Sequence, residues 1–316
     1  MINPRARRWV ALAVALPVMA LLGAAGWLYT PDKPAAELDE LYLRAPSDIR
    51  DVAGLHLHVR DTGPRDAPVL ILLHGFGASL QTWEPWAARL EARYRVIRFD
   101  LPGFGLTGQD PTGDYTDARS VDVLLALMDQ LAIARGTLIG NSLGGKIAWN
   151  FALDHPERVD RLVLISPDGF ASPGFEYGRR AKLPLMVRLL PYVMPRAMLR
   201  SSLVPAYGDP SHLTEAIVTR YRDLMLAPGV RVAMLARMQQ VMLQDPVPLL
   251  RRIRAPTLLL WGDRDGMIPV ANARDYADAM PNARLVTLPG LGHVPFEEAP
   301  DRSLAPVLEF LASPRS

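Results

Sequence analysis

The sequence of 316 residues contains no cysteine. This absence excludes disulfide bonds, thiol nucleophiles and metal sites built on cysteine. A strong charge of either sign is also absent, since the formal net charge is +2, and no block of lysine and arginine is interleaved with aromatic residues. We therefore expect no nucleic-acid partner. The chain has no internal repeat, no cluster of metal ligands and no dinucleotide-binding fingerprint, so we expect neither a metal nor another cofactor.

Charged residues are absent from one long apolar stretch, Trp9 to Tyr29, which follows a basic N-terminus at residues 1–8. As a helix, this stretch would span about 31 Å, close to the roughly 30 Å hydrocarbon core of a bilayer. The basic flank favours a cytoplasmic N-terminus. We therefore expect a membrane anchor at 9–29, with the rest of the chain on the periplasmic face of a bacterial inner membrane. The alternative is a signal peptide cleaved near the small residues at 23–26, which would make the protein secreted.

Strands and helices are expected to alternate along most of the remaining chain. Residues 30–47 carry three prolines and mixed charges, which predicts a linker. Alternation of apolar residues from 55 to 59 predicts a half-buried, antiparallel first strand, with His56 and His58 on its solvent face. A continuous apolar run at 69–73 predicts a strand buried on both faces, and further strands are expected at 95–100, 137–140, 161–166, 256–261 and 283–288. The pattern indicates an α/β fold with a mostly parallel, doubly wound sheet.

The alternation stops between Asp168 and about Pro248, where the chain is rich in Met, Leu, Pro and Arg. Helical stretches are expected there at about 181–190, 214–226 and 230–243. We expect a helical cap at 169–249, inserted after the sixth strand, between two parts of one core at 48–168 and 250–316. The arginines of this cap fit either a solvated surface or contact with an anionic lipid surface.

A candidate nucleophile follows the predicted strand at 137–140. Gly140, Ser142 and Gly144 form a Gly-x-Ser-x-Gly turn between this strand and a helical pattern, which is the context of a nucleophile elbow. The glycines remove Cβ atoms that would clash in so tight a turn, and the serine backbone is expected to be strained. The N–H of Leu143 would then point toward a substrate oxyanion.

A serine hydroxyl needs a base and a carboxylate that orients that base. Asp265 follows the predicted strand at 256–261, and His293 follows the last strand, so the order along the chain is Ser, Asp, His. Asp263, in the same loop, and Asp168, after an earlier strand, are alternative acids.

With these residues in place, the chain resembles the α/β-hydrolase fold serine hydrolases from about residue 48 to 314, outside the cap. The sequence His-Gly-Phe-Gly at 74–77 matches the oxyanion loop of the family, and Asp-Leu-Pro-Gly-Phe-Gly at 100–105 matches its Asp-x-x-Gly-x-Gly turn. The resemblance implies a triad of Ser142, Asp265 and His293. It also implies that the N–H groups of Phe76 and Leu143 form the oxyanion hole, supported by His74, Gly75, Gly77 and Asn141.

Serine at position 142 predicts an acyl-enzyme and hence hydrolysis of carboxylic esters, including lipid-like acyl esters, as in membrane-anchored esterases and lipases of the family. The elbow Gly-Asn-Ser-Leu-Gly-Gly also resembles that of carbon–carbon bond hydrolases of ring-fission products. Those enzymes typically place a tryptophan soon after the histidine, whereas His293 is followed by Val-Pro-Phe. The alternative outside enzymes is a ligand-binding module that has lost catalysis. The expected partner is a small-molecule ester, together with the membrane contacted by the N-terminal segment.

Overall fold

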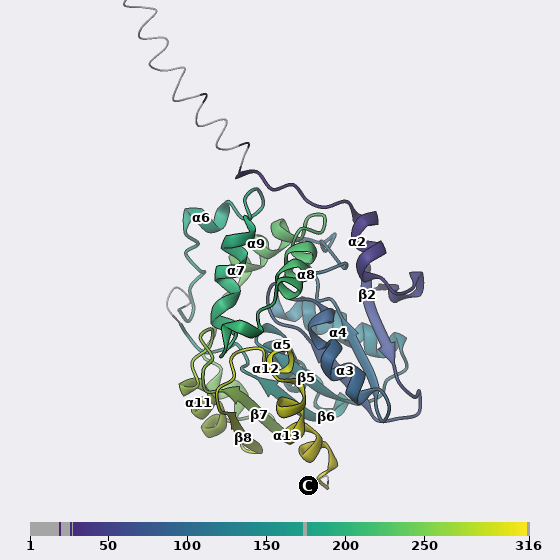
Figure 1. Cartoon of the computed structure of the whole chain (residues 1–316). Coiled ribbons are helices and arrows are strands. Elements are labelled where there is room, and N and C mark those ends of the chain that lie inside the picture. Colours follow the sequence, from purple (N-terminus) through teal and green to yellow (C-terminus); the bar gives the residue numbers. More distant parts are fainter. Residues whose placement is uncertain (1–18, 20–25, 27, 173–175, 315–316) are drawn as a thin grey trace, which may run out of the picture.

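The computed structural model describes Met19, Gly26 and residues 28–172 and 176–314. An eight-stranded sheet of order β1-β2-β4-β3-β5-β6-β7-β8 forms its centre (Figure 1). The strands are β1 Ile49–Val52, β2 Leu55–Thr62, β3 Val69–Leu73, β4 Arg95–Phe99, β5 Gly136–Asn141, β6 Val159–Ile165, β7 Thr257–Gly262 and β8 Ala283–Leu288. The pairs β1/β2 and β2/β4 are antiparallel, and the other neighbours are parallel. The expected α/β fold, with its antiparallel first strands, is confirmed.

Helices cover both faces of this sheet. Along β3, Ile71 and Leu73 pack into one buried cluster with residues of α4 and α5, while Leu70 and Leu72 pack into a second cluster with residues of α3 and α13. This explains the continuous apolar runs, because alternate side chains enter opposite clusters. The helices of the core are α3 Glu84–Leu90, α4 Asp117–Gln130, α5 Leu143–Asp154, α11 Ala271–Ala279, α12 Pro295–Glu298 and α13 Pro300–Ala312.

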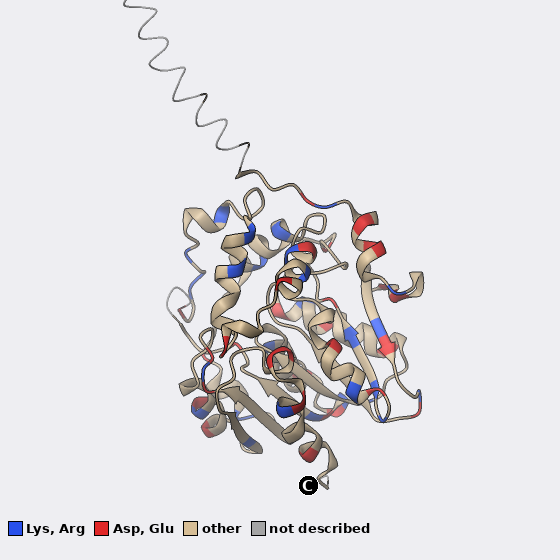
Figure 2. Cartoon of the chain, viewed as in Figure 1, with Lys and Arg blue, Asp and Glu red and all other residues tan. Residues whose placement is uncertain are grey.

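A group of helices is inserted between β6 and β7 and lies together at one end of the molecule (Figure 1). Lysine and arginine positions are spread over these helices, for example along α7 (Figure 2). The expected helical stretches at 214–226 and 230–243 match α8 and α9. The stretch expected at 181–190 is reduced to the single turn α6, because Pro184 precedes this turn and Pro191 follows it. The helices are α6 Leu185–Arg188, α7 Arg196–Leu203, α8 Glu215–Met225, α9 Val230–Gln240 and α10 Val247–Leu250.

Residues 30–47, expected as a linker, contain the helix α2 Ala35–Tyr42 and dock on the inserted helices. Leu38 is fully buried in the core. Asp32 pairs with Arg231 of α9 at 2.6 Å, and Lys33 pairs with Asp223 of α8 at 3.1 Å. The segment is therefore a strap across the molecule, a role that proline content and mixed charge do not indicate.

The prediction for His58 is wrong. His56 is exposed as expected, but His58 is fully buried, and its Nδ1 lies 2.8 Å from the Oδ2 of Asp100. The strand β2 lies between β1 and β4 and is covered on both faces over most of its length, so it has no continuous solvent face.

The predictions of a membrane anchor and of a periplasmic or secreted location need correction. A membrane span requires about 20 consecutive apolar residues in one helix. No helix within Met19, Gly26, 28–172 and 176–314 is long and apolar enough to cross a bilayer. Residues 1–8 and all of 9–29 except Met19, Gly26, Leu28 and Tyr29 lie outside the described residues.

Candidate active site

Ser142 occupies a strained turn between β5 and α5. Its backbone has φ 52° and ψ −117°, a conformation that residues other than glycine rarely adopt. The two flanking glycines permit this turn. A Cβ at Gly140 would lie 2.3 Å from the carbonyl oxygen of Gly144, and a Cβ at Gly144 would lie 2.2 Å from that of Leu73. The expected strain and the need for both glycines are confirmed.

Backbone hydrogen bonds hold this turn against the neighbouring strand. The N–H of Ser142 donates to the carbonyl oxygen of Ile165 at 3.0 Å, and its carbonyl oxygen accepts from the N–H of Asp168 at 3.0 Å. The side chain of Asn141 donates from Nδ2 to the carbonyl oxygens of Ile165 and His293, at 3.1 and 3.0 Å. Asn141 therefore connects the serine turn to the histidine loop.

The structure brings His293 and Asp265 together. Nδ1 of His293 lies 2.7 Å from Oδ2 of Asp265, and the other carboxylate oxygen accepts from the N–H groups of Met267 and Ile268, both at 2.8 Å. Burial alone would raise the pKa of Asp265, but the His293 ring and the Ile268 N–H outweigh it, so that the pKa lies below its usual value. An ionised carboxylate at this place fixes a proton on Nδ1 and leaves Nε2 as the free base of the ring.

The two alternative acids make other contacts. Asp263 accepts from the N–H of Gly290 through Oδ1 at 2.6 Å. Asp168 lines the same pocket as Ser142, and its carbonyl oxygen accepts from Tyr276 at 2.8 Å, while the ring of His293 is bound to Asp265. The geometry thus favours Asp265 over both alternatives as the partner of the base.

His74 supports the loop that carries Phe76. The ring is fully buried, accepts at Nε2 from the N–H of Leu101 at 2.9 Å, and donates from Nδ1 to the carbonyl oxygen of Gly75 at 2.8 Å. These roles require a neutral ring, and burial lowers the pKa of His74 accordingly. A ring held as donor and acceptor in this way is a brace of the loop and has no free nitrogen for catalysis.

The remaining glycines of this loop allow close approaches. A Cβ at Gly75 would lie 2.9 Å from Oδ1 of Asn141 and 3.3 Å from Cβ of Ser142. Gly77 has φ +70°, and a Cβ there would lie 2.6 Å from Cε of Met225 in α8. The loop therefore passes between the serine turn and the inserted helices.

Asp100 braces the loops near this site. Its carboxylate accepts from the N–H of Leu80 at 2.6 Å and from the N–H of Leu106 at 2.8 Å, in addition to its contact with His58. Burial opposes ionisation, but the contact with His58 and the Leu80 N–H hold the pKa of Asp100 below its usual value.

Ser142 and His293 open into one cavity of about 220 Å³. Phe76 and Leu143, the two residues expected to supply oxyanion donors, also line it. The inserted segment contributes Arg237, Met238, Val241 and Leu243, and the β7–α11 loop contributes Met267 and Ile268. Most of this lining is apolar, which suits a substrate with a hydrocarbon portion.

The histidine loop is clamped by residues that the sequence reasoning missed. Glu298 of α12 accepts from the N–H of Gly292 at 2.8 Å and from those of Gly208 and Asp209 at 3.1 and 2.8 Å. The N–H of His293 donates to the carbonyl oxygen of Ala206 at 2.7 Å. One buried carboxylate thereby joins the loop of His293 to the segment that follows α7. The only local indication of this contact in the sequence is that an acidic residue, Glu298, follows His293 by five positions.

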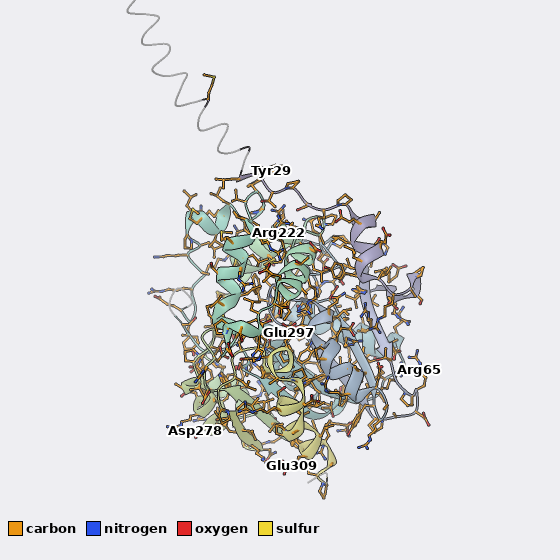
Figure 3. All side chains as sticks on the ribbon, in the orientation of Figure 1. Tyr29, Arg65, Arg222, Asp278, Glu297 and Glu309 are labelled. Carbon is orange, nitrogen blue, oxygen red and sulfur yellow. The ribbon has the colours of Figure 1, made fainter. Side chains whose placement is uncertain are left out.

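The neighbouring Glu297 connects the same region to α8. Its carboxylate accepts from Thr82 at 2.5 Å and Tyr207 at 2.7 Å, and pairs with Arg220 of α8. Figure 3 shows Glu297 near the middle of the molecule, on α12. In the part of the chain that the structure describes, no three His, Asp or Glu side chains are placed to hold a metal ion.

The sheet order, the turn at Ser142 and the helices inserted between β6 and β7 define a hydrolase of the α/β-hydrolase fold. A family model described as the alpha/beta hydrolase family matches residues 70–306. The chain belongs to this family.

Three proteins that are similar to this chain have different names. A 2-hydroxy-6-oxononadienedioate/2-hydroxy-6-oxononatrienedioate hydrolase of Comamonas testosteroni is 30% identical and covers 84% of this chain and 94% of its own length. The solved structure of a meta-cleavage product hydrolase from Pseudomonas fluorescens is 26% identical, with a TM-score of 0.73, over 84% of this chain and 98% of its own. That of a membrane phospholipase A is 25% identical, with a TM-score of 0.70, over 98% of both chains.

Proposed function

We propose that the protein is a serine hydrolase that cleaves carboxylic esters through an acyl-enzyme on Ser142. The observation that carries the proposal is the 2.7 Å contact between His293 Nδ1 and Asp265, in a pocket that Ser142 also lines. His293 is the base, Asp265 orients it, and the N–H groups of Phe76 and Leu143 bind the oxyanion. His74, Gly75, Gly77 and Asn141 support these loops.

The chemistry follows from these roles. Nε2 of His293 takes the proton of the Ser142 hydroxyl as Oγ attacks the ester carbonyl. The tetrahedral oxyanion is stabilised by the two N–H groups, each worth about 10² to 10³ in rate. Collapse breaks the bond to the alcohol oxygen, which receives the proton from His293. A water molecule, deprotonated by the same nitrogen, then releases the acid and restores Ser142.

The size and lining of the pocket support an ester with an apolar acyl group. A cavity of about 220 Å³ walled by Met238, Val241, Leu243 and Ile268 offers an acyl chain more contacts than it offers a polar group. The similarity to a membrane phospholipase A over 98% of this chain also supports ester hydrolysis.

The second candidate is hydrolysis of a carbon–carbon bond in a ring-fission product. It is favoured by the similarity to the hydrolase from Comamonas testosteroni and to the meta-cleavage product hydrolase, whose names state substrates of this kind. The residue after His293 is Val294, which is buried. Pro295 and Phe296 come next, so the tryptophan that enzymes of this kind typically carry soon after the histidine is lacking here.

The experiment that separates the candidates compares two substrate classes on one preparation. We expect kcat/KM for p-nitrophenyl butyrate or longer esters to exceed that for 2-hydroxy-6-oxo-6-phenylhexa-2,4-dienoate at least tenfold, and both to vanish in Ser142→Ala. A reversed preference would establish the carbon–carbon hydrolase instead. Strict preference for acetyl over longer acyl groups would contradict an apolar acyl pocket.

A further inference from the structure

A lysine is buried beside the proposed nucleophile, and nothing in ester cleavage itself requires it. Lys146 and Arg237 are 7% and 3% exposed, and both line the pocket of Ser142. We propose that Lys146, supported by Arg237 and Asp117, binds a carboxylate of the substrate, so that the preferred ester carries an anionic group near the scissile carbonyl. The proposal rests on the function proposed for Ser142 and specifies its substrate class.

The position of Lys146 follows from the helix that carries the nucleophile turn. Lys146 lies four residues after Ser142 in α5, and its N–H donates to the carbonyl oxygen of Ser142 at 3.0 Å. Residues four apart share one face of a helix, and helical side chains lean toward the N-terminus. The lysine stem is therefore directed to the end of the helix where Ser142 lies.

Lys146 also borders a second cavity. This cavity of about 190 Å³ is lined by Asp117, Asn150 and Gln244 among other residues, and it shares Lys146 with the pocket of Ser142. An ammonium group at the border of an apolar pocket and a more polar cavity provides an anchor for the polar end of a substrate whose hydrocarbon part lies in the first pocket.

Lys146 is only partly paired, because it shares its carboxylate partner with Arg237. Oδ1 of Asp117 lies 2.5 Å from Arg237, and Oδ2 lies 2.9 Å from Nζ of Lys146. One carboxylate thus serves two cations. Within residues 28–172 and 176–314, Lys146 has no second carboxylate within 4.0 Å, and Asp168, which lines the same pocket, is not paired with it. A buried cation without full compensation is unfavourable, and a substrate carboxylate would supply the missing charge.

Arg237 and Asp117 attach the inserted helices to the core, and Lys146 is not needed for this attachment. Arg237 of α9 donates to the carbonyl oxygen of Tyr115 at 2.6 Å as well as to Asp117. Gln240, also in α9, donates to the carbonyl oxygen of Gly113 at 2.8 Å and accepts from the N–H of Tyr115 at 2.8 Å. These bonds hold α9 on the core without Lys146, which lies on the same core as Asp117.

The test uses the full chain and two esters that differ in one charge, monoethyl adipate and diethyl adipate. In the wild type we expect a higher kcat/KM for the monoester. Lys146→Met removes the charge at similar length and should lower the ratio of monoester to diester rates about tenfold or more, the size of one charge-assisted contact. Lys146→Arg should restore much of the ratio. Lys182→Met, which removes a charge from the inserted segment away from this pocket, should leave both rates unchanged.

A binding measurement separates this proposal from the proposed function. Ser142→Ala should bind monoethyl adipate in calorimetry, and Ser142→Ala with Lys146→Met should bind it about tenfold more weakly or not measurably. If neither ester is hydrolysed but this difference in binding persists, the subsite stands and ester hydrolysis is refuted. If the wild type shows no preference for the monoester, or Lys146→Met alters neither the ratio nor the binding, the carboxylate subsite is overturned.

Discussion

The two sides of the pocket are held in different ways. On the serine side, Ser142 is placed by steric fit, since its backbone is strained and Gly140 and Gly144 leave no room for a methyl group. On the histidine side, His293 is placed by hydrogen bonds to Asp265, Asn141 and the segment that follows α7. On the serine side, one contiguous turn between β5 and α5 is packed against the neighbouring strands β3 and β6. On the histidine side, the loop is oriented by side chains and carbonyl groups from separate loops far away in the sequence.

The two sides of the pocket should therefore respond differently to substitution. A steric lock ties Ser142 to the centre of the sheet, so disturbing it should reduce the stability of the whole domain. A network of hydrogen bonds orients one loop, so disturbing it should reduce the rate before it reduces stability. The following changes test this contrast.

The largest effect is expected at the acid of the histidine side. Asp265→Asn keeps the shape of the side chain but no longer favours a proton on Nδ1 of His293, so kcat should fall by about 10⁴. The fall is to be measured by steady-state kinetics on a p-nitrophenyl ester, with the melting temperature as a check on folding. Asp263→Asn is the matched control from the same loop, and we expect it to change kcat less than tenfold. A greater loss in Asp263→Asn than in Asp265→Asn would reverse the assignment of the acid.

The steric lock is tested by Gly144→Ala. The added methyl group would lie 2.2 Å from the carbonyl oxygen of Leu73 in β3, so we expect a loss of about 3 kcal/mol or more in the free energy of unfolding. Urea denaturation measures this loss. In Gly136→Ala, on β5, the nearest atom is 3.4 Å from the new Cβ, and the cost should stay below about 1 kcal/mol. Similar losses in both variants would show that the close approach at Gly144 is not a lock.

The clamp on the histidine loop is tested by Glu298→Gln. The amide offers one acceptor oxygen, whereas the carboxylate uses two to bind the N–H groups of Gly292, Gly208 and Asp209. We expect a loss of about 1 to 3 kcal/mol in stability and a fall in kcat at unchanged KM. Glu309→Gln, at an exposed position of α13, should change neither quantity. A stability loss with wild-type kcat would remove Glu298 from the positioning of His293.

The smallest effect is expected from relief of strain at the nucleophile. Ser142→Gly and Ser142→Ala both remove the hydroxyl, but only glycine adopts φ 52° with ψ −117° without a Cβ penalty. Ser142→Gly should therefore be more stable than Ser142→Ala by about 1 kcal/mol, seen as a melting temperature higher by about 2 to 4 °C. Equal melting temperatures would mean that little strain is stored at this turn.

The same contrast explains what the sequence could predict. The turn around Ser142 is contiguous, so its glycines, its strain and its place between strand and helix follow from a short motif. The continuous apolar runs likewise indicate the parallel strands, because burial on both faces leaves its mark within each strand.

Contacts between residues that are far apart in the sequence cannot be recognised from a local sequence pattern. His58 has the alternating context of a half-exposed strand, yet it is buried against Asp100, 42 residues away. Residues 30–47 have the composition of a linker, yet Leu38 is fully buried. Glu298 joins the histidine loop to Gly208, 90 residues away. In each case the partner, not the local pattern, decides the structure.

The central claim is that Ser142 is a nucleophile activated by His293 and Asp265. Its most direct test is labelling of the full chain with a fluorophosphonate, followed by mass spectrometry of the intact protein and of its peptides. We expect one adduct, on the peptide that contains Ser142, formed much more slowly in Asp265→Asn and absent in Ser142→Ala. A protein that forms no adduct, or one that persists in Ser142→Ala, would contradict the claim and favour a ligand-binding module that has lost catalysis.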